Sequence, residues 1–387
     1  MSSKVLNQDV MRSVNQKLVL QQIFNEGPIS RIDVSKKIKL NKSTVSTLYN
    51  MLKENSLVVE LGQGESTSSG GRKPIFTQVN AHWGYTVSFE IGYRHLHMMT
   101  NYLNGDIISF RNFDIVGMDI HQIIDAMRAK VRQINIPGTL HGLLGIGVAV
   151  SGTVLDEHVV HAPFIDMKDE NIVRSLTGEF QVPVMMENEA NLSAIYERDF
   201  NEAGLYLNTI TVSIHKGIGA GIIIDSQLYR GLNGEAGEIG RSIMMDANVG
   251  MLDNFRKVED FCSEDAIIGF AQGVKEDPSL QRDDLVDLFR SDDEDIKKIL
   301  DEFTTAIAKI IFNVASEFDP EAIFINSPLI DELPSLLEQI RQKYQLISRN
   351  RTRIRLAKDS QHATLLGACS LITHRVLKMD DYALKFV

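Results

Sequence analysis

Four short segments of the sequence combine carboxylates, carboxamides and glycines in a way that suits a polyhydroxylated ligand. They are Glu90–Arg94, Glu187–Asn191, Lys216–Gly221 and Gly231–Arg241. Carboxylates, amides and a guanidinium can each form two hydrogen bonds to neighbouring hydroxyl groups. The glycines of the fourth segment allow the backbone to bring Glu238 and Arg241 close to a ligand. Each segment alone is most often a turn or a helix cap, so it is their joint order that favours a binding site.

The first 80 residues differ in charge from the rest of the chain. They contain 11 Lys and Arg against 6 Asp and Glu, a balance of +5. Because the whole chain carries −11, residues 81–387 carry −16. A small cationic module on a large acidic body is typical of a protein that holds DNA with one part only.

A helix-turn-helix pattern lies within the cationic part. Apolar residues at helical spacing between Val10 and Ile23 predict a first helix that ends before Asn25. Ser30 and Asp33 can cap a second helix over about residues 31–39. Asn41 is then the expected N-cap of a third helix.

The third helix has the pattern of a recognition helix. Its buried stripe is predicted to consist of Val45, Leu48, Tyr49 and Leu52. The opposite face, near the N-terminal end, carries the residues expected to meet bases and phosphates in a major groove. These residues are Lys42, Ser43, Thr44, Ser46 and Thr47.

Two short strands after the third helix predict the wing of a winged helix. Residues 57–61 and 75–79 read as strands, and no apolar residue occurs over 62–71 between them. Arg72 and Lys73 are expected to reach the DNA backbone or a minor groove. The alternative is a three-helix module that binds protein and whose cations are merely solvated.

From residue 81 onward the sequence predicts an α/β body of two lobes. Strands at 85–91, 96–102 and 107–113, a helix at 120–134 and a strand at 142–150 build the first lobe. A helix over about 295–317 suggests a second α/β lobe, and two such lobes normally leave a ligand cleft between them. The expected domains are 1–80, 81–200 and 201–387, with the C-terminal helix free to return to the first lobe.

Composition narrows the class of protein further. The first residues contain no apolar signal-peptide region, and no apolar run reaches the length of about 18 residues that a membrane span needs. Cys262 and Cys369 are too few for a disulfide framework or a structural Cys₄ zinc site. A cytoplasmic protein without a membrane partner is therefore expected.

In their order along the chain, the four segments resemble the ROK family of sugar kinases and sugar-responsive repressors. The most specific parts are Gly231–Arg241 and Glu187–Asn191, and the resemblance covers nearly the whole chain. It implies an α/β fold in which a winged helix-turn-helix precedes a two-lobed, actin-like ATPase body similar to a ROK sugar kinase. Within the family, the chain resembles the repressors that join such a winged helix to the sugar-binding body and respond to xylose.

The chain departs from the family pattern where phosphoryl transfer takes place. Family kinases have Glu-Asn-Asp-Ala-Asn, whose Asp accepts a proton from the sugar; here that position is Glu189. The added methylene moves the carboxylate by roughly 1 Å, which can cost about a hundredfold in rate. The first phosphate motif, from Glu90 to His95, lacks its hydroxyl, and the second reads His215-Lys216-Gly217 instead of Gly-Thr-Gly. These departures argue against a kinase, so no catalytic residue and no cofactor is expected.

The zinc site of some relatives is also absent from the sequence. Arg241 stands where those relatives have His, and residues 246–258 contain no cysteine, so no metal is expected. The resemblance assigns sugar contacts to Asn188, Glu189, Glu238, Arg241 and Glu259, with Ser151 and Gly152 lining the cleft. Arg241 can instead form an ion pair with Glu238 or Glu189, which would make its role structural.

The sequence therefore predicts a homodimeric repressor that leaves its operator DNA when a small sugar, D-xylose first of all, binds the kinase-like body. An active ATP-dependent sugar kinase is one alternative. A repressor that responds to another sugar, a sugar phosphate or a partner protein is the other.

Overall fold

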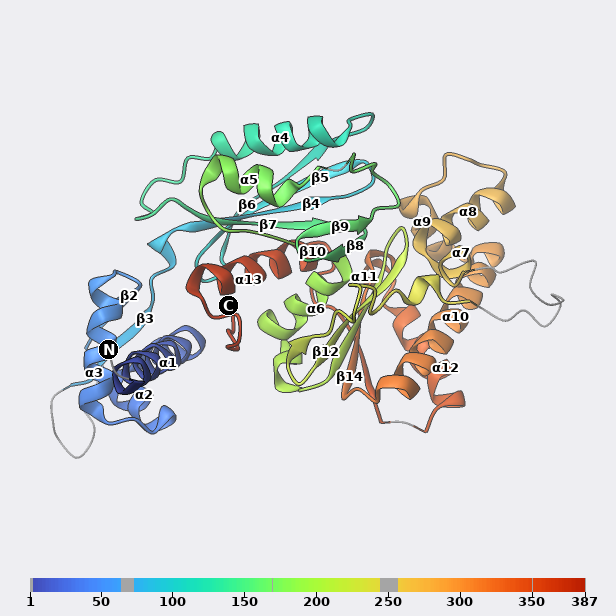
Figure 1. The fold of residues 1–387 in the computed structure, drawn as a ribbon. Coiled ribbons are helices and arrows are strands. Elements are labelled where there is room, and N and C mark those ends of the chain that lie inside the picture. Colours follow the sequence, from blue (N-terminus) through green and yellow to red (C-terminus); the bar gives the residue numbers. More distant parts are fainter. Residues whose placement is uncertain (1–2, 64–72, 169, 244–256, 350, 387) are drawn as a thin grey trace. The chain divides into compact units, whose positions relative to one another are not determined.

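The computed structural model describes residues 3–63, 73–168, 170–243, 257–349 and 351–386 (Figure 1). Their contacts form two compact units. The first unit comprises residues 1–148, 164–186 and 368–387, and the second comprises residues 149–163 and 187–367. Among the described helices, none combines the length and the apolar character that a membrane crossing requires. The three-part domain division given above stays a prediction.

The winged helix-turn-helix is present at the start of the first unit. Its elements are α1 (Ser3–Glu26), β1 (Ile29–Ser30), α2 (Arg31–Ile38), α3 (Lys42–Glu54), β2 (Val58–Gln63) and β3 (Ile75–Val79). The strands form an antiparallel sheet in the order β1-β3-β2. Ser30 caps α2 by accepting a hydrogen bond from the Asp33 backbone N–H. The expected stripe of α3, from Val45 to Leu52, is buried.

Two details of this module differ from expectation. Asn41 has the extended backbone of an N-cap, but its side chain makes no capping hydrogen bond to α3. In α1, Val10 and Val14 are 56% and 43% exposed, whereas Ile23 is buried. The periodicity of α1 thus predicted a helix correctly, and its buried apolar residues, which begin at Val19, lie in the C-terminal half of the helix.

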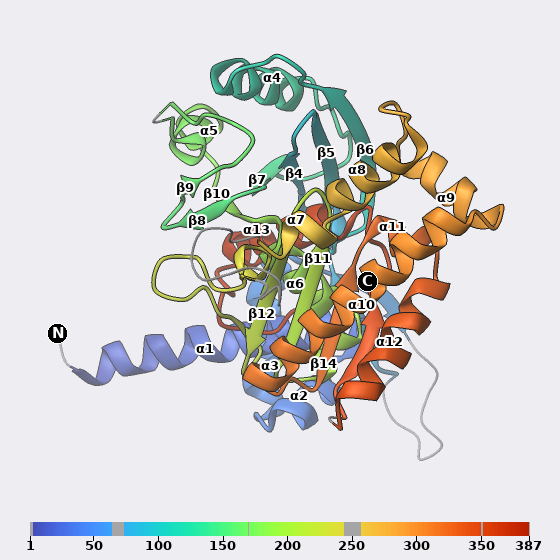
Figure 2. The same ribbon diagram turned by 90° about the vertical axis from the view of Figure 1, so that its right-hand side faces the viewer.

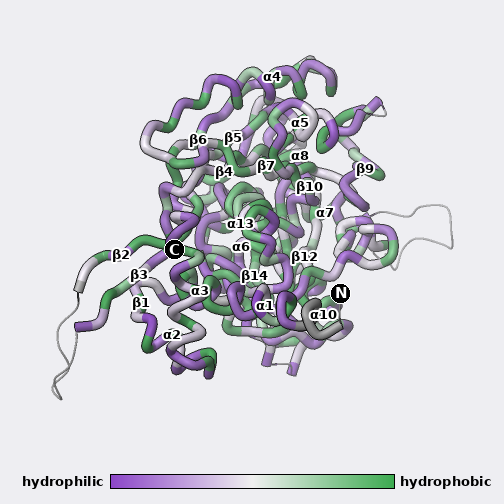
Figure 3. Tube along the Cα trace, turned by 60° about the vertical axis from the view of Figure 1, so that its left-hand side comes forward, coloured by the Kyte–Doolittle hydropathy of each residue, from purple (hydrophilic) through white to green (hydrophobic). Residues whose placement is uncertain are grey.

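The body of the first unit is a five-stranded sheet in the order β10-β7-β4-β5-β6. The strands are β4 (Tyr85–Ile91), β5 (His95–Tyr102), β6 (Ile107–Asp114), β7 (Leu143–Val150) and β10 (Val184–Asn188), close to the ranges expected from sequence. A short 3₁₀ turn, η1 (Ala81–Trp83), leads from β3 into β4. Helices α4 (Ile120–Arg132) and α5 (Ile172–Phe180) lie together beside the sheet (Figure 1). Figure 3 shows α4 alternating between hydrophilic and hydrophobic residues, as expected of a helix with one buried face.

Helix α13 (Ala363–Leu377) packs on β7 of this sheet through two glycines. A Cβ atom on Gly147 would lie 2.6 Å from the Ala368 carbonyl oxygen, and one on Gly145 would lie 2.6 Å from the Ile372 side chain. The Thr86 hydroxyl and the Cys369 thiol, 3.5 Å apart, add a buried polar contact between β4 and α13. The helix begins in the second unit and continues in the first.

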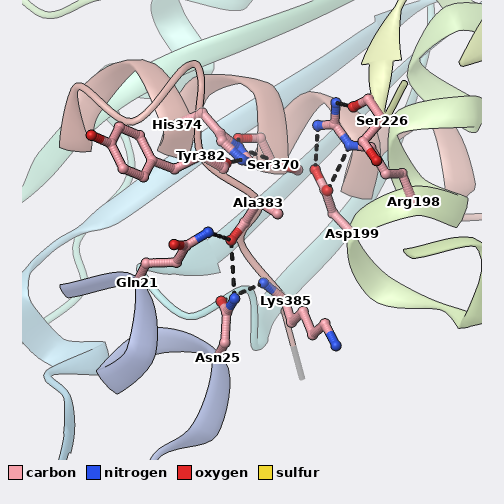
Figure 4. Close-up of polar contacts among 10 residues, drawn as sticks. All are labelled: Gln21, Asn25, Arg198, Asp199, Ser226, Ser370, His374, Tyr382, Ala383 and Lys385. Carbon is pink, nitrogen blue, oxygen red and sulfur yellow. Dashed lines mark hydrogen bonds and ion pairs between the residues drawn. The ribbon is translucent and has the colours of Figure 1, made fainter. Parts of the chain in front are cut away.

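The segment after α13 returns to the winged helix (Figure 4). The Ala383 carbonyl accepts hydrogen bonds from the side chains of Gln21 (2.8 Å) and Asn25 (3.0 Å) in α1. The Lys385 backbone N–H donates to the Asn25 side-chain oxygen at 2.8 Å. Phe386 lies edge-on to Phe24, with the ring centroids 5.0 Å apart. These contacts hold the C-terminal segment, residues 379–386, on the buried half of α1.

The second unit is built on a five-stranded sheet in the order β13-β12-β11-β14-β15. Its strands are β11 (Thr209–Ile214), β12 (Ile218–Ile224), β13 (Gln227–Leu228), β14 (Ala322–Asn326) and β15 (Arg353–Leu356). The expected long helix is α10 (Glu294–Phe318), and Figure 2 shows it beside α12 (Ser335–Ile347) in front of β11 and β14. The remaining elements are β8 (Thr153–Leu155), β9 (His158–His161), α6 (Glu189–Phe200), η2 (Glu202–Leu205), η3 (Ile239–Arg241), α7 (Glu259–Cys262), α8 (Glu264–Lys275), α9 (Arg282–Arg290) and α11 (Pro328–Glu332).

The glycine-rich stretch that was read as a turn before a strand is largely strand. The turn is confined to residues 215–217, and β12 begins at Ile218, so Gly219 and Gly221 lie inside the strand. A Cβ on Gly221 would lie 2.4 Å from the Ala190 carbonyl oxygen, and one on Gly219 would lie 3.1 Å from the Ala190 side chain. These two glycines therefore allow α6 to lie close against β12, which fixes the helix that starts at Glu189.

A buried carboxyl group in α6 makes stability depend on pH. Burial raises the pKa of Glu197 to about 8, although the nearby Lys358 lowers it. A carboxyl group with a raised folded-state pKa destabilises the fold as pH rises from its unfolded pKa of 4.5 through 8, because only the unfolded state gives up its proton. At about 1.4 kcal/mol per pKa unit, Glu197→Gln is expected to gain a few kcal/mol of stability over wild type at pH 8 and little at pH 4.5. Urea unfolding at both pH values checks this, with the exposed Glu302→Gln as the control that should show no such difference.

Candidate functional site

The centre of the candidate sugar site is the junction between β10 and α6. Asn188 ends the strand and caps the helix, because its side-chain oxygen accepts hydrogen bonds from the Ala190 and Asn191 backbone N–H groups. Its side-chain NH₂ donates to the Gly152 carbonyl at 2.8 Å. The amide is therefore fixed at both ends, and Glu189 follows as the first residue of the helix. A carboxylate is favoured there by the unpaired N–H groups and the dipole of a helix N-terminus.

Ser151 is hydrogen-bonded directly to the carboxylate of Glu189. Its hydroxyl donates to Glu189 Oε2 over 2.6 Å, a short distance typical of a hydrogen bond to a charged acceptor. Gly152 has no room for a side chain, since a Cβ atom would lie 2.3 Å from the His161 carbonyl oxygen of β9. The structure thus brings Ser151, Gly152, Asn188 and Glu189 into one connected group, as the resemblance implied.

Glu238 is attached to the same group through a residue that sequence reasoning missed. Thr153 donates a hydrogen bond from its hydroxyl to Glu238 Oε1 at 3.3 Å, and it directly follows Gly152 in the chain. The loop that carries Glu238 needs its glycines: Gly237 has φ +91°, and a Cβ there would lie 1.8 Å from the Ala220 carbonyl oxygen. The Ser-Gly-Thr tripeptide, with a second hydroxyl beside the first, is the signal that could have revealed Thr153.

Glu259 lies between two backbone turns of the second unit. Its Oε2 lies close to both Gly217 and Gly240. A Cβ atom built on Gly217 would be 3.3 Å from this oxygen, and one built on Gly240 would be 3.2 Å from it. Lys257 Nζ is 3.4 Å from its Oε1. Glu259 therefore lies against the turn after β11 and the loop after Glu238.

Arg241 takes neither of the ion-pair partners considered from the sequence. Its Nη1 is 3.2 Å from Glu235 Oε1, and both side chains are about half exposed. The pair lies within the Gly231–Arg241 loop, where three positive-φ glycines let the chain fold back on itself. The expectation of a pair with Glu238 or Glu189 was wrong because this turn places Glu235 nearer.

Glu187 stabilises the junction between β10 and α6 and was not among the predicted site residues. It is 3% exposed, and its two oxygens accept hydrogen bonds from Arg230 Nε (2.7 Å), the Asn188 backbone N–H (2.9 Å) and Asn191 Nδ2 (3.0 Å). A buried carboxylate with these partners holds the strand end and the start of α6 in a fixed geometry. Arg230 thereby links the loop before Gly231 to the same junction.

The residues predicted to bind DNA lie on α3 and before β3, and their role stays a prediction. Lys42, Ser43 and Thr47 of α3 are exposed, whereas Thr44 and Ser46 are half-buried. The Thr47 hydroxyl donates to the Ser43 carbonyl at 3.1 Å, so it also satisfies the helix backbone. Lys73 is exposed before β3, and Arg72 lies outside the described residues.

The two cysteines are unsuited to metal binding. Burial raises the pKa of the Cys262 thiol to about 12 and that of Cys369 to about 11. Metal ligation needs the thiolate, so both groups are held in the wrong protonation state at neutral pH. Residues 246–256, in which the family's cysteine cluster would stand, lie outside the described residues.

The arrangement of these side chains suits ligand binding better than catalysis. Within the second unit, Ser151, Asn188, Glu189, Thr153 and Glu238 place carboxylate oxygens and polar donors in one bonded group. Such a set matches vicinal hydroxyl groups, each of which donates one hydrogen bond and accepts others. Glu189 Oε2, the position of the family's catalytic base, is already engaged by the Ser151 hydroxyl.

Comparisons with known proteins agree with this organisation. The ROK family model matches residues 86–375. The xylose repressor of Lactiplantibacillus pentosus is 46% identical over 387 residues, covering 100% of this chain and 99% of that protein. A solved ROK family transcriptional regulator, a homologue of the E. coli MLC protein, superimposes with a TM-score of 0.80 at 21% identity over 96% of this chain and 98% of its own. A Streptomyces griseus ROK glucokinase solved with glucose and AMPPNP gives a TM-score of 0.64 at 24% identity, over 74% of this chain and 99% of its own. On the extent of the family match and the full-length identity to a curated relative, this chain belongs to the ROK family.

Proposed function

We propose that this chain is a sugar-responsive transcriptional repressor that binds operator DNA through its winged helix and leaves it when D-xylose binds the second unit. The observation that carries the proposal is the bonded group around Glu189, with its carboxylate and amide ligands, in a chain that also has an exposed recognition helix. The full-length identity of 46% to a protein named xylose repressor supports both the repressor function and the choice of sugar.

We propose that the repressor acts as a homodimer in the cytoplasm. One winged helix reads only a few base pairs, so two copies on a palindromic operator supply the remaining contacts. The sugar acts through a difference in affinity between two conformations, and a coupling of about 1–3 kcal/mol is typical of such systems. Size-exclusion chromatography with light scattering measures the oligomeric state, and a monomer at working concentration contradicts the dimer.

We place the connection between sugar and DNA along α6, α13 and the C-terminal segment. In the second unit, Gly367 of α13 lies against α6, where a Cβ would be 1.9 Å from the Leu192 carbonyl oxygen. The Ser193 and Thr364 hydroxyls, 3.4 Å apart, bridge the same two helices. Helix α13 then continues into the first unit and ends in residues 379–386, which bind α1 of the winged helix.

An operator gel-shift titration tests the proposal. D-Xylose at millimolar concentration is expected to release the DNA, whereas D-glucose, which carries one further hydroxymethyl group, is the matched comparison. If xylose leaves the complex intact while calorimetry shows that it binds, the sugar is a ligand without regulatory effect. If neither occurs, a sugar phosphate or a partner protein is the signal.

Sugar kinase activity is the second candidate, favoured by the kinase-like fold shared with the solved glucokinase. The replacement of the family's catalytic Asp by Glu189, and the Ser151 hydroxyl on that carboxylate, count against it. A coupled assay of ADP release over a panel of pentoses and hexoses separates the two functions. Turnover above background would make the chain an enzyme and overturn the repressor-only proposal.

Lys42→Ala tests the DNA-binding face. Lys42 is the first residue of α3 and is exposed, so we expect it to contact a phosphate group. Its loss should weaken binding to all DNA sequences alike and reduce the slope of log K against log salt by about one. Sugar affinity should stay unchanged. Lys298→Ala, an exposed lysine of α10 in the second unit, is the control, and equal losses from both variants would contradict a specific role for Lys42.

A further inference from the structure

Two histidines and a glutamate gather at one end of the sheet in the first unit, whereas the group proposed to bind sugar belongs to the second unit. Glu90 is the last residue but one of β4, and His95 and His97 are the first and third residues of β5. One ligand atom from each of these side chains lies within 4.8 Å of the other two. Among the described residues, no other set of three His, Cys, Asp or Glu side chains meets this condition.

The pairing of β4 with β5 puts the three side chains on one face of the sheet. Glu90 lies directly opposite His97 in the antiparallel register, so their side chains point to the same side. His95 is two residues before His97 and shares that side, because side chains alternate along a strand. The two imidazole rings are stacked, with centroids 4.0 Å apart and planes inclined by 25°.

The turn between the strands is shaped to accept an imidazole. A Cβ atom on Gly92 would lie 2.3 Å from His95 Nε2, so only glycine allows the ring to lie over the turn. On the other side, Phe110 of β6 packs against His97 with centroids 5.3 Å apart. His97 Nδ1 is 3.1 Å from Glu90 Oε2, and both side chains are no more than 20% exposed. The three groups are therefore half-buried and confined by their neighbours.

We propose that Glu90, His95 and His97 form a binding site for a borderline divalent metal ion of the zinc class. Two imidazoles and one carboxylate are the protein ligands of open zinc sites and of the facial triad that binds ferrous iron. Zinc–ligand bonds of about 2.0–2.2 Å require ligand atoms that now lie within 4.8 Å of one another to approach by roughly 1 Å. Water or a ligand from solution completes the coordination.

A cross-strand His–Glu pair alone would explain part of this geometry but not the second imidazole. A His–Glu pair also occurs outside the strands: His121 Nδ1 of α4 and Glu170 Oε1 are 3.3 Å apart, and among the described residues no third His, Cys, Asp or Glu completes a set of metal ligands with them. His95 is the second imidazole of the cluster, and its ring lies next to Gly92 and stacks on His97.

Metal binding to the full-length chain, freed of any affinity tag and treated with a chelator, tests the site. Calorimetry with Zn²⁺ is expected to give one site per chain, and Co²⁺ is expected to give visible d–d absorption bands without thiolate charge transfer. His95→Gln and His97→Gln should each weaken Zn²⁺ binding by more than about tenfold, because each removes a ligand. His121→Gln, which breaks the two-residue pair, should leave the affinity unchanged.

Three results would overturn the site. They are no saturable Zn²⁺ binding to the wild-type chain, equal loss of affinity in His121→Gln, or undiminished binding in both His95→Gln and His97→Gln. If either variant fails to fold, X-ray absorption at the zinc edge of the loaded wild-type protein decides, since imidazole ligands give a distinct scattering pattern. The sugar response uses residues of the second unit, so failure of the metal site and failure of the proposed repressor function are separate outcomes.

Discussion

Glu189→Gln is expected to leave operator binding intact and to raise the xylose concentration needed for release by about tenfold to a hundredfold. The neutral amide can still accept the Ser151 hydrogen bond through its carbonyl oxygen, so the junction between β10 and α6 should keep its shape. What is lost is the charged acceptor for the sugar, and hydrogen bonds to charged groups contribute about 1.5–3 kcal/mol. Calorimetry with xylose and an operator gel shift measure the two effects separately.

The control for this change is Glu264→Gln. Glu264 is another carboxylate of the second unit; it is buried (7% exposed), and its partner is Arg282 in α9. Its replacement should lower stability without changing the affinity for sugar in the folded protein. Loss of operator binding in Glu189→Gln would show that the residue holds the fold together, and an unchanged sugar titration would remove it from the site.

Asn25→Ala combined with Phe386→Ala is expected to uncouple the two functions. Asn25 donates to the Ala383 carbonyl and accepts from the Lys385 backbone N–H, and Phe386 packs on Phe24. Two hydrogen bonds at about 1 kcal/mol each and one aromatic pair at about 1 kcal/mol are comparable with the whole coupling energy expected between sugar and DNA. Xylose should still bind, but it should change the operator affinity by less than about twofold.

Lys385→Ala is the matched control for the uncoupled variant. Only the backbone N–H of Lys385 contacts Asn25, and Figure 4 shows its side chain pointing away from α1. The substitution therefore removes a charge from the same segment without removing a contact. If the double variant responds to xylose as fully as Lys385→Ala does, the C-terminal segment does not carry the signal.

The helices and strands were largely predictable because their signals are local. The buried stripe of α3 and the strand from Tyr85 to Ile91 follow from apolar periodicity, which does not depend on distant residues. The error at Gly219 and Gly221 shows the limit of that approach. Glycine favours a turn when nothing else is known, but here α6 lies against the strand at these two positions, and that contact is tertiary.

The sequence indicated which residues to consider for the site, whose role in sugar binding stays a prediction, but not how they are connected. Motif order indicated Asn188, Glu189 and Glu238, whereas the Thr153 hydroxyl that joins Glu238 to the group depends on how β8 meets a loop 85 residues later. The partner of Arg241 depends in the same way on loop geometry that three positive-φ glycines create. The cluster at His95 and His97 was missed because Glu90 had been assigned to a phosphate motif.

The meeting of the two chain ends on α1 has a consequence for building hybrid regulators. A winged helix is usually exchanged by cutting once, in the connection between it and the body. Here residues 379–386, which follow the last helix, contact Gln21 and Asn25, so the two halves of the joint lie more than 350 residues apart in sequence. In a chimera that joins a foreign winged helix to the host's body, the host's C-terminal segment would not match the new α1. Such a chimera is expected to bind DNA and sugar, but sugar binding would not change its affinity for DNA. Transplanting α1 together with residues 379–386 keeps the joint whole, so the unit of exchange in this fold is discontinuous in sequence.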